Sequence, residues 1–500
     1  EPLREALPGE GVLLCLPDEG GPEHVGTFID AARSALASGT RFVVVQGRRG
    51  AAGVARTLHL EASDVATTVV TLADPEPVAG PARQEAVRRV TAEVAGTSGY
   101  AEAFYDADGN RTVPVLRVRP PTGVRRGQAP LGPDDVVLVT GGGKGITAEC
   151  ALSLAIEYGS ALVLCGRAAP EEDAELAANL DRMRAADARF VHVRADVTRP
   201  EEVRRAVHEA QERLGPVTAV LHGAGHNEPT ALASLTRSAF HRALAPKVEG
   251  LRTVLDALDP ERLRLLVTFG SIIGRSGLRG EAHYSTANDW LTEMTVEYGR
   301  EHPNTRVLAL EWSVWSGAGM GERLGVVEAL MRDGITPVST EEGIAALHQT
   351  LTDHSAGPVR VVSGRTGDLP TLNTDTTDLP LGRFLDRILV HYPGVELVTQ
   401  AVLSPGDDPY LDDHLLDGDL LLPAVIGMEA MAQVAAAVSG HVGPPVMEGM
   451  RFLRPVVVRP GAATTIRVAA LVRDAHTVEV VLRSEETGYD ADHFRAVLRW

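Results

Sequence analysis

Cysteine is scarce in this sequence of 500 residues, which holds only Cys15, Cys150 and Cys165. An odd number of cysteines without C-x-x-C spacing argues against a disulfide framework and a zinc site, so we expect no metal and a reducing, cytoplasmic setting. Long apolar runs are also lacking, since none approaches the roughly 20 residues of a membrane span. The sequence starts at Glu1 without a charged-then-apolar leader, and the missing methionine predicts a piece of a longer protein.

Basic residues are fewer than acidic residues in this sequence. Lys and Arg together number 48 against 67 Asp and Glu, which gives a formal net charge of −19. Such a field repels nucleic acid and anionic membranes, and the arginines are scattered rather than gathered into runs. We therefore expect neither nucleic acid nor a membrane among the partners.

The composition itself is that of a globular protein, with 44% hydrophobic and 23% charged residues. At about 150 residues a domain, the length predicts roughly three domains. Between residues 11 and 118, apolar runs alternate with helix-like stretches, which predicts a βαβ layer. The turn after its first strand, PDEGG, lacks a glycine fingerprint. We therefore interpret residues 1–130 as a packing partner and not as a dinucleotide site.

A second α/β block follows a connector at 119–135 that is rich in Pro, Gly and Arg. Its seven strand candidates, separated by helical periods, predict one doubly wound parallel sheet over 131–366. Residues 367–384 have the composition of a linker. The remaining segment, 385–500, holds one strongly apolar helix candidate at 424–438 and then alternating, strand-like runs. The predicted fold class is α/β with two doubly wound layers, followed by an α+β unit.

A glycine-rich turn marks the candidate cofactor site. The strand at 136–140 runs into GGGKGIT and then into a helix-like segment, the order that a pyrophosphate site requires. Gly141, Gly143 and Gly145 let the backbone approach phosphate, and the helix start presents free N–H groups. The alternative is a purely structural turn.

Two later strand ends extend this interpretation. Arg167 ends the second strand, where its guanidinium can pair with a 2′-phosphate, and no acidic ribose partner stands there. This favours NADPH over NADH. Asp196 and Val197 end the third strand and are candidates for an adenine contact, although an Asp at a strand end also serves as a cap or turn residue.

The candidate catalytic residues lie further along the chain. Reduction of a ketone needs a donor that polarises the carbonyl and an acid that protonates the developing alkoxide, and Ser271 and Tyr284 suit these roles. Tyrosine is a poor acid unless a cation stabilises its phenolate, and Lys247 is a candidate for that cation. Asn288 shares a helix face with Tyr284. Taken singly, each residue also has an ordinary structural interpretation.

The motifs TGGGKGI, GR, ADV, HGAG and YSTAN, with Lys247 and Ser271, together resemble the ketoreductase domains of modular and iterative polyketide synthases. The resemblance implies that serine and tyrosine hold the carbonyl while lysine and asparagine complete a proton relay. It extends the cofactor contacts to Ile146, Gly223 and Ala224. It covers roughly residues 8–364, and it identifies the first layer as a Rossmann-like structural subdomain without cofactor.

This chain departs from the family pattern in three places. Thr147 stands where the third glycine of TGxxxGxG is expected, which affects helix packing near the cofactor. No Leu-Asp-Asp follows HGAG, and no tryptophan lies between Ser271 and Tyr284, so the configuration of the alcohol is undetermined. The run EWSVWSGAGM resembles a flexible loop on the substrate side, although Trp312 and Trp315 are equally compatible with a core.

The segment HLLDGDLLLP (414–423) matches the HxxxGxxxxP pattern of polyketide synthase dehydratases. Dehydration needs a base for the α-proton and an acid for the leaving hydroxyl, and His414 would be the base. With Gly418 and Pro423 in place and an apolar helix behind them, the unit resembles a hotdog fold. The family's acid is an Asp in a second hotdog, which predicts a truncated dehydratase here. Glu429 resembles the acid of single-hotdog dehydratases, or is structural.

The order of the two domains resembles iterative synthases of the enediyne or polyunsaturated-fatty-acid type. The resemblance implies an acyl carrier protein with a phosphopantetheine-tethered substrate, and other synthase domains in the parent chain, as partners. It also allows a homodimer. The expected function is NADPH-dependent reduction of a β-ketoacyl thioester followed by dehydration. The alternatives are a ketoreductase with an inactive hotdog unit and a non-catalytic scaffold module.

Overall fold

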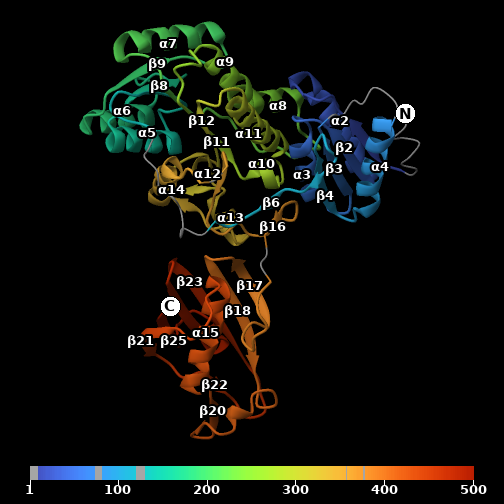
Figure 1. Cartoon of the computed structure of the whole chain (residues 1–500), viewed down its shortest axis with the longest axis vertical. Helices are drawn as coiled ribbons and strands as arrows, with labels where there is room; N and C mark the ends of the chain where they lie inside the picture. The colour runs from blue at the N-terminus through green and yellow to red at the C-terminus, as the bar shows by residue number, and fades with distance from the viewer. Residues whose placement is uncertain (1–9, 74–80, 120–129, 356, 376–377) are drawn as a thin grey trace. The chain divides into compact units, whose positions relative to one another are not determined.

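The computed structural model describes five ranges of the chain, which are 10–73, 81–119, 130–355, 357–375 and 378–500. Its contacts divide the chain into two compact units (Figure 1). The first unit comprises Glu1–Pro114 and Arg125–Asn373, and the second comprises Val115–Val124 and Thr374–Trp500. Within the described ranges, every helix is too short or too polar to cross a membrane.

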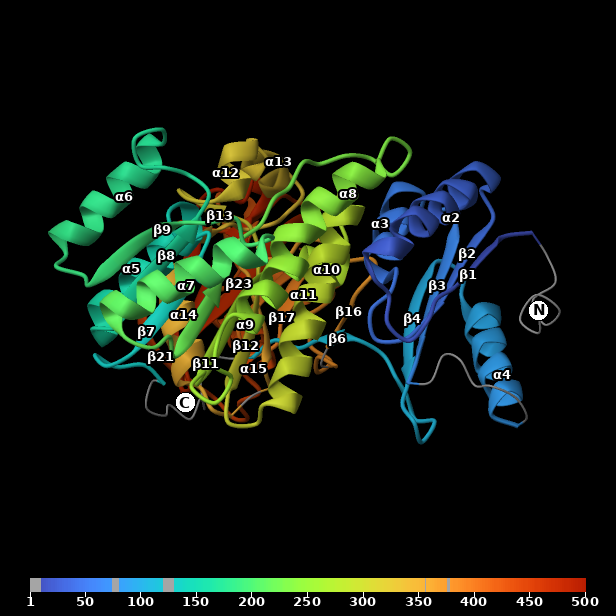
Figure 2. The same ribbon diagram turned by 90° about the horizontal axis from the view of Figure 1, so that it is seen from above.

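The first unit begins with a layer of strands and helices. In chain order its elements are β1 (Val12–Cys15), η1 (Pro22–His24), α2 (Val25–Ser38), β2 (Arg41–Gln46), α3 (Ala52–Glu61), β3 (Ala66–Leu72), α4 (Pro81–Gly96), β4 (Tyr100–Tyr105) and β5 (Arg111–Thr112). The strands form one sheet in the order β1-β2-β3-β4-β5, parallel except for β5. Helices α2 and α3 cover one face and α4 the other (Figure 2).

The same unit continues into a larger layer. Its elements are β7 (Val136–Thr140), α5 (Gly145–Tyr158), β8 (Ala161–Gly166), α6 (Ala174–Ala185), β9 (Phe190–Arg194), α7 (Pro200–Leu214), β10 (Ala219–His222), α8 (Arg237–Leu244), η2 (Ala245–Glu249), α9 (Gly250–Asp256), β11 (Leu265–Ser271), α10 (Ile273–Ser276), α11 (Ala282–Glu301), β12 (Arg306–Trp312), β13 (Trp315–Ser316), α12 (Met320–Leu324), α13 (Val327–Arg332), β14 (Val338–Ser339), α14 (Thr340–Thr352) and β15 (Val359–Val362). Its main sheet is parallel, in the order β15-β12-β11-β10-β7-β8-β9. The order reverses between β7 and β10, the place where such sheets bind ligands.

Apolar burial on both faces explains this parallel sheet. Strands β7, β8 and β11 are buried along almost their whole length, and their sequences are near-continuous runs of Val and Leu. Helices α5, α6 and α14 pack on one face, and α7, α9 and α11 pack on the other. The predicted doubly wound sheet is therefore confirmed.

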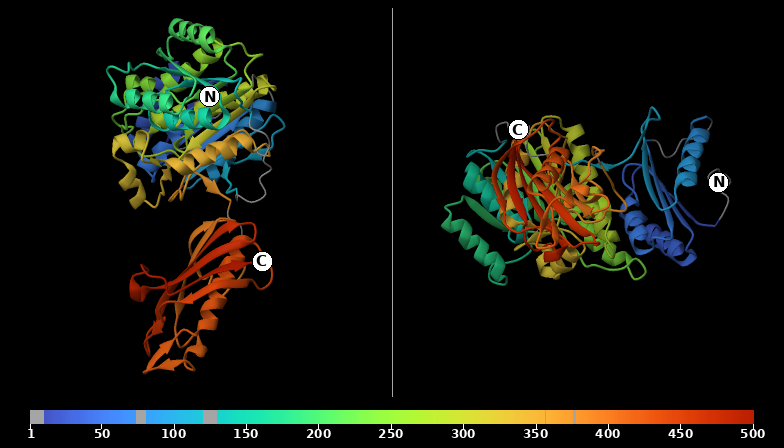
Figure 3. Two further views of the ribbon diagram at one scale, coloured as in Figure 1. Left: turned by 90° about the vertical axis from the view of Figure 1, so that its left-hand side faces the viewer. Right: turned by 90° about the horizontal axis from the view of Figure 1, so that it is seen from below.

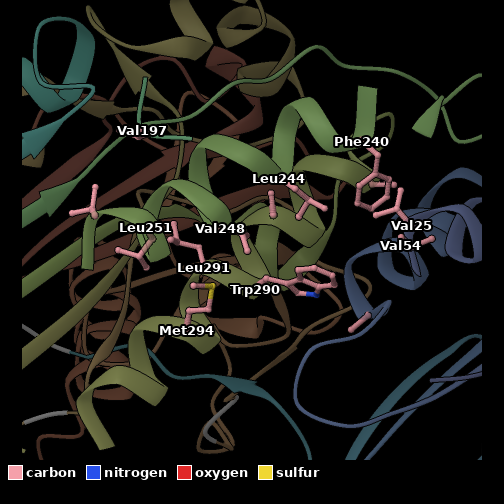
Figure 4. Packing of buried hydrophobic residues seen from close by; sticks show 14 of the residues in the cluster. Val25, Val54, Val197, Phe240, Leu244, Val248, Leu251, Trp290, Leu291 and Met294 are labelled. Carbon is pink, nitrogen blue, oxygen red and sulfur yellow. The ribbon is translucent and has the colours of Figure 1, made fainter. Parts of the chain in front are cut away.

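One hydrophobic core joins the two layers of the first unit. Trp290 on α11 packs edge-on against Phe28 on α2, with ring centroids 6.3 Å apart. Its indole N–H donates a hydrogen bond of 2.9 Å to the carbonyl of Gly50 in the first layer. Val54 on α3 and Phe240 on α8 belong to the same core (Figure 4). The first layer thus packs against α11, the helix that carries Tyr284 and Asn288, and supports its position.

The second unit is built from antiparallel strands and one long helix. Its elements are β6 (Val115–Leu116), β17 (Arg387–Tyr392), β18 (Glu396–Leu403), η3 (Pro409–Leu411), β19 (Leu415–Leu416), β20 (Asp419–Leu421), α15 (Ala424–Ser439), β21 (Val446–Phe452), β22 (Val457–Val458), β23 (Thr464–Asp474), β24 (Thr477–Ser484), η4 (Glu485–Thr487) and β25 (Phe494–Arg499), with β16 (Asn373–Thr374) at the unit boundary. The main sheet has the order β17-β18-β23-β24-β25-β21 and packs on α15 (Figure 3).

The sequence pattern accounts for this second core. Every other side chain is buried along β24 and along β23 as far as Ala470, as expected for a sheet with one face on a helix. The buried face of α15 includes Met431, Val434 and Val438. A helix wrapped by an antiparallel sheet is the hotdog arrangement predicted from the sequence, and the predicted fold class is confirmed.

Candidate active site

The turn between β7 and α5 is shaped for close approach of another group. Gly141 and Gly145 have positive φ angles of 67° and 58°, which favour glycine. A Cβ atom at residue 141 would lie 3.0 Å from both the amide nitrogen of Ala224 and the carbonyl oxygen of Gly223. The turn therefore packs directly on the segment after β10, at the point where the strand order reverses.

A carboxylate of the chain itself lies on this turn. The N–H of Gly145 donates a hydrogen bond of 2.9 Å to Oε1 of Glu175. Beside it, Lys144 donates to Asp173, and Asn179 donates to the carbonyl of Gly143 at 3.0 Å. An N–H at the start of a helix attracts anions, and here it already holds one. The N–H of Gly145 therefore points to a position that suits an anionic oxygen.

The strand ends beyond the turn carry the other predicted cofactor residues. Arg167 follows β8 and is exposed. Oδ1 of Asp196 accepts hydrogen bonds from the backbone N–H and the hydroxyl of Thr198, at 3.0 and 2.8 Å. Burial alone would raise the pKa of Asp196, but these bonds and the charge of Arg167 hold it below its usual value. Val197 is buried against Gly250. Asp196 therefore also acts as a turn residue, the alternative noted above.

The unusual Thr147 is accommodated by a glycine. Thr147 is buried on α5, and a Cβ atom at residue 223 would lie 2.3 Å from its hydroxyl oxygen. Gly223 therefore leaves the room that the threonine needs. The neighbouring Ala224 donates its N–H to the hydroxyl of Thr140 at 3.3 Å. Ile146 is the second residue of α5 and is partly buried.

The four predicted catalytic residues meet at the carboxyl end of β11. Ser271 is the last residue of this strand, and Tyr284 lies in the first turn of α11. Lys247 on η2 donates from Nζ to the carbonyl of Phe269 at 2.9 Å, and this Nζ lies 5.6 Å from the centroid of the Tyr284 ring. Asn288 donates to the carbonyl of Tyr284 at 2.7 Å. The lysine and the tyrosine are thus brought together from separate elements.

Burial shifts the pKa values of Lys247 and Tyr284. It lowers the pKa of Lys247 to about 7. It also raises the pKa of Tyr284 to about 12, with a further increase from the charge of Glu281 and an opposing hydrogen bond from Asn288. Oδ1 of Asn288 has no hydrogen-bond partner among the described residues. A partly buried tyrosine beside a buried lysine can exchange a proton with a bound oxygen.

Two polar neighbours of the candidate site, His222 and Glu281, were missed by the sequence reasoning. His222 bridges the two halves of the site, because Nδ1 lies 2.9 Å from the hydroxyl of Thr140 and Nε2 lies 3.1 Å from the carbonyl of Lys247. Burial and the charge of Lys247 lower its pKa to about 3, so it is neutral at physiological pH. Glu281 is the second neighbour, buried at the start of α11. The histidine of HGAG was a usable signal, whereas Glu281 belongs to no quoted motif.

The two tryptophans of the EWSVWSGAGM run are core residues. Trp312 ends β12 and Trp315 begins β13, and both are buried. Their rings pack edge-on with centroids 5.0 Å apart. Of the two interpretations left open by the sequence, the structure supports the core.

Cys15 is exposed, whereas the other two cysteines lie in the core of the larger layer. Cys150 and Cys165 are buried, and burial raises the pKa of both thiols, that of Cys165 to about 12. In the described ranges, His, Cys, Asp and Glu side chains form no group of three that could hold a metal ion.

In the second unit, His414 is exposed in the connection between η3 and β19. The following hairpin turns through Asp417 and Gly418, whose φ angles are 53° and 94°. No carboxylate of the described residues pairs with the His414 ring. Glu429 on α15 is exposed and accepts a hydrogen bond of 2.9 Å from Gln433. The structure thus places the predicted base without an acid beside it.

Each unit contains a region that matches a known protein family. Residues 135–317 match the KR domain, and residues 385–485 match the polyketide synthase dehydratase domain. The chain is 28% identical over 246 residues to polyketide synthase PksN of Bacillus subtilis, a match that covers 48% of this chain and 4% of PksN. It is 31% identical over 228 residues to 6-methylsalicylic acid synthase of Penicillium expansum, covering 43% of this chain and 13% of that synthase.

A solved structure shares the fold. A ketoreductase domain from the bacillaene assembly line matches with a TM-score of 0.57 and 23% identity, covering 68% of this chain and 82% of that domain. Together the matches confirm the predicted resemblance to ketoreductase and dehydratase domains. They support a segment of a modular polyketide synthase and give no support to the enediyne or polyunsaturated-fatty-acid type. The chain spans only a small part of either curated relative.

Proposed function

We propose that the first unit uses NADPH to reduce a β-ketoacyl thioester, carried on the phosphopantetheine arm of an acyl carrier protein, to the β-hydroxyacyl thioester. The observation that carries this proposal is the buried Lys247 ammonium 5.6 Å from the ring of Tyr284 at the end of β11. This pair stands at the same sheet edge as the glycine turn. The match of residues 135–317 to the KR domain supports the same reaction.

The cofactor would lie along the carboxyl ends of β7, β8 and β10. Its pyrophosphate would take the N–H groups of the Gly141–Gly145 turn, where Glu175 now supplies an anion. Arg167 would pair with the 2′-phosphate and so select NADPH. Asp196 and Val197 would border the adenine, and Gly223 and Ala224 would lie under the dinucleotide. Bound NADPH would supply the two electrons that reduce the β-carbon.

The side chains of the chain itself would hold and protonate the ketone. The hydroxyls of Ser271 and Tyr284 would both donate hydrogen bonds to the ketone oxygen and so stabilise charge developing on it. Tyr284 would then pass its proton to that oxygen, leaving a phenolate. The Lys247 ammonium would stabilise this phenolate, because desolvated charges interact strongly. Asn288 would complete the relay that returns a proton to the tyrosine.

For the second unit we propose β-hydroxyacyl dehydratase ancestry with His414 as the base. Its match to the polyketide synthase dehydratase domain supports this assignment. Removal of water also needs an acid, and none of the described carboxylates pairs with His414. The parent chain, its other synthase domains, or a second copy in a homodimer would supply the acid. We propose that the whole assembly works in the cytoplasm.

The test is NADPH oxidation with a β-ketoacyl thioester, with the product identified by mass. We expect the chain as given to accumulate the β-hydroxyacyl thioester, two mass units above the ketone, and to form no enoyl product. The reason is that a base without an acid loses the catalysis of the leaving hydroxyl, about 10²- to 10⁴-fold. An enoyl product that disappears in His414→Ala would show a working dehydratase. Lack of NADPH binding in folded protein would favour the scaffold alternative.

The glycine turn gives a second prediction. Gly141→Ala is expected to raise the Kd for NADPH at least tenfold, since the new methyl group combines a positive φ with backbone atoms 3.0 Å away. The measurement is a titration of NADPH fluorescence. Gly132→Ala is the matched control, because a Cβ atom at residue 132 has nothing within 4 Å. Equal Kd values for the two variants would contradict the proposed cofactor site.

The pH dependence of reduction follows from two buried groups near Tyr284. Burial lowers the pKa of Lys247 to about 7 and raises that of Glu281 to about 7. As the pH rises through this value, the lysine loses its positive charge and the carboxyl gains a negative one. Both changes disfavour the phenolate of Tyr284, so kcat/KM for reduction is expected to fall above about pH 7 more steeply than a single ionisation allows.

The matched variants separate the two ionisations. In Glu281→Gln the decrease of kcat/KM with pH should have the slope of a single ionisation. Glu301→Gln, which changes an exposed carboxyl at the end of the same helix, should keep the original pH profile. A pH profile that stays flat through 7 in the unsubstituted protein would contradict the assignment of Lys247 as the cation.

A further inference from the structure

A buried carboxyl and an amide form a pair beside the catalytic tyrosine. Glu281 is only 5% exposed, and its Oε1 accepts a hydrogen bond of 2.9 Å from Nδ2 of Asn227. Within the part of the chain that the structure describes, Oε2 of Glu281 and Oδ1 of Asn227 are buried without any hydrogen-bond partner. Each group thus uses one of its two polar atoms on the other and leaves the second atom open. Buried polar groups in folded proteins normally have partners, so both open atoms call for an explanation.

The pair lies on the reaction side of the site. Glu281 is the N-cap residue directly before α11 and precedes Tyr284 by three residues. The charge of Glu281 contributes to the raised pKa of Tyr284, as expected for close neighbours. Asn227 follows the HGAG segment, which begins at His222, the last residue of β10. Residues from two separate elements thus converge next to the phenol and away from Arg167 and Asp196 at the proposed adenine end.

The surroundings of the pair determine which hydrogen bonds it can make. Burial raises the pKa of Glu281 to about 7, opposed only by the bond from Asn227. Below that pH the carboxyl is neutral, and the open Oε2 can donate a proton. Oδ1 of an amide is an acceptor only. The nearby Glu228 and Arg242 pair with each other at 2.8 Å. They therefore do not form hydrogen bonds with the open Oε2 and Oδ1 atoms.

Building on the proposed reduction, we propose that Asn227 and Glu281 form a subsite for a substrate group that both donates and accepts a hydrogen bond. The group donates to Oδ1 of Asn227 and accepts from Oε2 of Glu281. Two parts of a carrier-bound β-ketoacyl thioester have this chemistry. One is a hydroxyl on the acyl chain, and the other is an amide of the phosphopantetheine arm. The subsite selects substrates that carry this group and aligns the ketone with Tyr284.

The experiment compares kcat/KM for four β-ketohexanoyl thioesters with the whole 500-residue chain and NADPH. Two carry the pantetheine arm and two carry a propyl group without amides, and within each pair one has a δ-hydroxyl and one does not. Loss of the recognised group should lower kcat/KM about tenfold, the value of one or two buried hydrogen bonds. A drop on removal of the hydroxyl identifies the acyl chain as the source, and a drop on removal of the amides identifies the arm.

Variants of the pair then assign the selectivity. Glu281→Met and Asn227→Leu should remove the tenfold preference, because they delete the open polar atoms at similar side-chain volume. Glu281→Gln should keep the preference, since its amide can still accept from Asn227 and donate to the ligand. The ratio between substrates is the readout because all four react by the same chemistry at Tyr284. Changes in the acidity of that tyrosine therefore cancel. Glu301→Gln is the control for an exposed carboxyl on α11.

The outcomes separate this inference from the proposed function. Reduction of all four substrates with equal kcat/KM would overturn the subsite and leave the reductase intact. The same holds for a preference that survives in Glu281→Met. No NADPH oxidation with any substrate would overturn both proposals. If Glu281→Met lowers the Tm and fails to fold, Glu281→Gln and Asn227→Leu still decide the question, because the first should keep the selectivity and the second should lose it.

Discussion

Tyr284→Phe is expected to lower kcat for β-ketoacyl reduction by about 10²- to 10⁴-fold, the usual contribution of a general acid. The substitution removes one oxygen from the Tyr284 ring and leaves the Lys247 ammonium in place 5.6 Å from the ring centroid. The ketone would then keep the hydrogen bond from Ser271 and lose its proton donor. The Kd for NADPH should change little, because the phenol lies at the reaction end of the site and not on the glycine turn.

Stopped-flow oxidation of NADPH with a β-ketoacyl thioester measures this effect, and a fluorescence titration measures the Kd. Tyr298→Phe is the matched control, since Tyr298 lies on the same helix and stacks on His302 with ring centroids 4.1 Å apart. This control should reduce the ketone at the unsubstituted rate. If Tyr284→Phe also kept more than about a tenth of kcat, another residue would have to supply the proton.

The fold was predictable because its signals are local. Near-continuous apolar runs such as 136–140 gave the parallel strands of the first unit. The apolar helix expected at 424–438 is found at Ala424–Ser439, and the alternating runs after it form the antiparallel sheet. The glycine turn was predictable for the same reason, since positive φ at Gly141 and Gly145 demands residues without a Cβ atom.

What escaped prediction depends on contacts between segments far apart in sequence. Glu175 lies 30 residues beyond Gly145 and reaches it only because α6 packs over the turn. The role proposed for Glu281 depends on its hydrogen bond with Asn227, which is 54 residues away. Neither carboxyl lies in a motif, and an isolated Glu in a sequence is most simply a solvated surface charge. Only the folded chain shows that Glu281 is buried and that one of its two carboxylate oxygens has a hydrogen-bond partner.

A buried arginine ties the first layer to the catalytic helix. Arg56 on α3 donates from Nη2 and Nε to the two carboxylate oxygens of Glu102 at 2.6 and 3.0 Å. Its Nη1 donates to Oδ1 of Asp289 on α11 at 3.2 Å. Burial alone would lower the pKa of Arg56, but these two carboxylates outweigh it and raise the pKa well above the usual value. The guanidinium is therefore the positive charge that makes both buried carboxylates tolerable.

Arg56→Met is accordingly expected to lower the apparent free energy of unfolding of the first unit by about 3–5 kcal/mol. The cost arises because the close positive charge is lost: Glu102 keeps only the hydroxyl of Tyr100, and Asp289 keeps the more distant Arg275. Urea unfolding followed by tryptophan fluorescence measures it, since Trp290 lies in the core that joins the same two layers. Arg88→Met is the control, because Arg88 pairs with Glu85 on the exposed side of α4 and such pairs contribute about 0–1 kcal/mol.

A double variant distinguishes two causes of the lower stability, which are the loss of favourable contacts and the cost of leaving a buried carboxylate without its arginine. If the cost of Arg56→Met comes from the carboxylates it leaves behind, then Arg56→Met combined with Glu102→Leu should be more stable than Arg56→Met alone, although it removes one more polar group. A simple loss of favourable contacts predicts the opposite order. The recovery should be partial, because Asp289 keeps only the more distant Arg275, whose Nη1 lies 3.7 Å from its Oδ1. Reductase activity should follow the same order of variants, since Asp289 neighbours Asn288 on the helix that holds the proton donor in place.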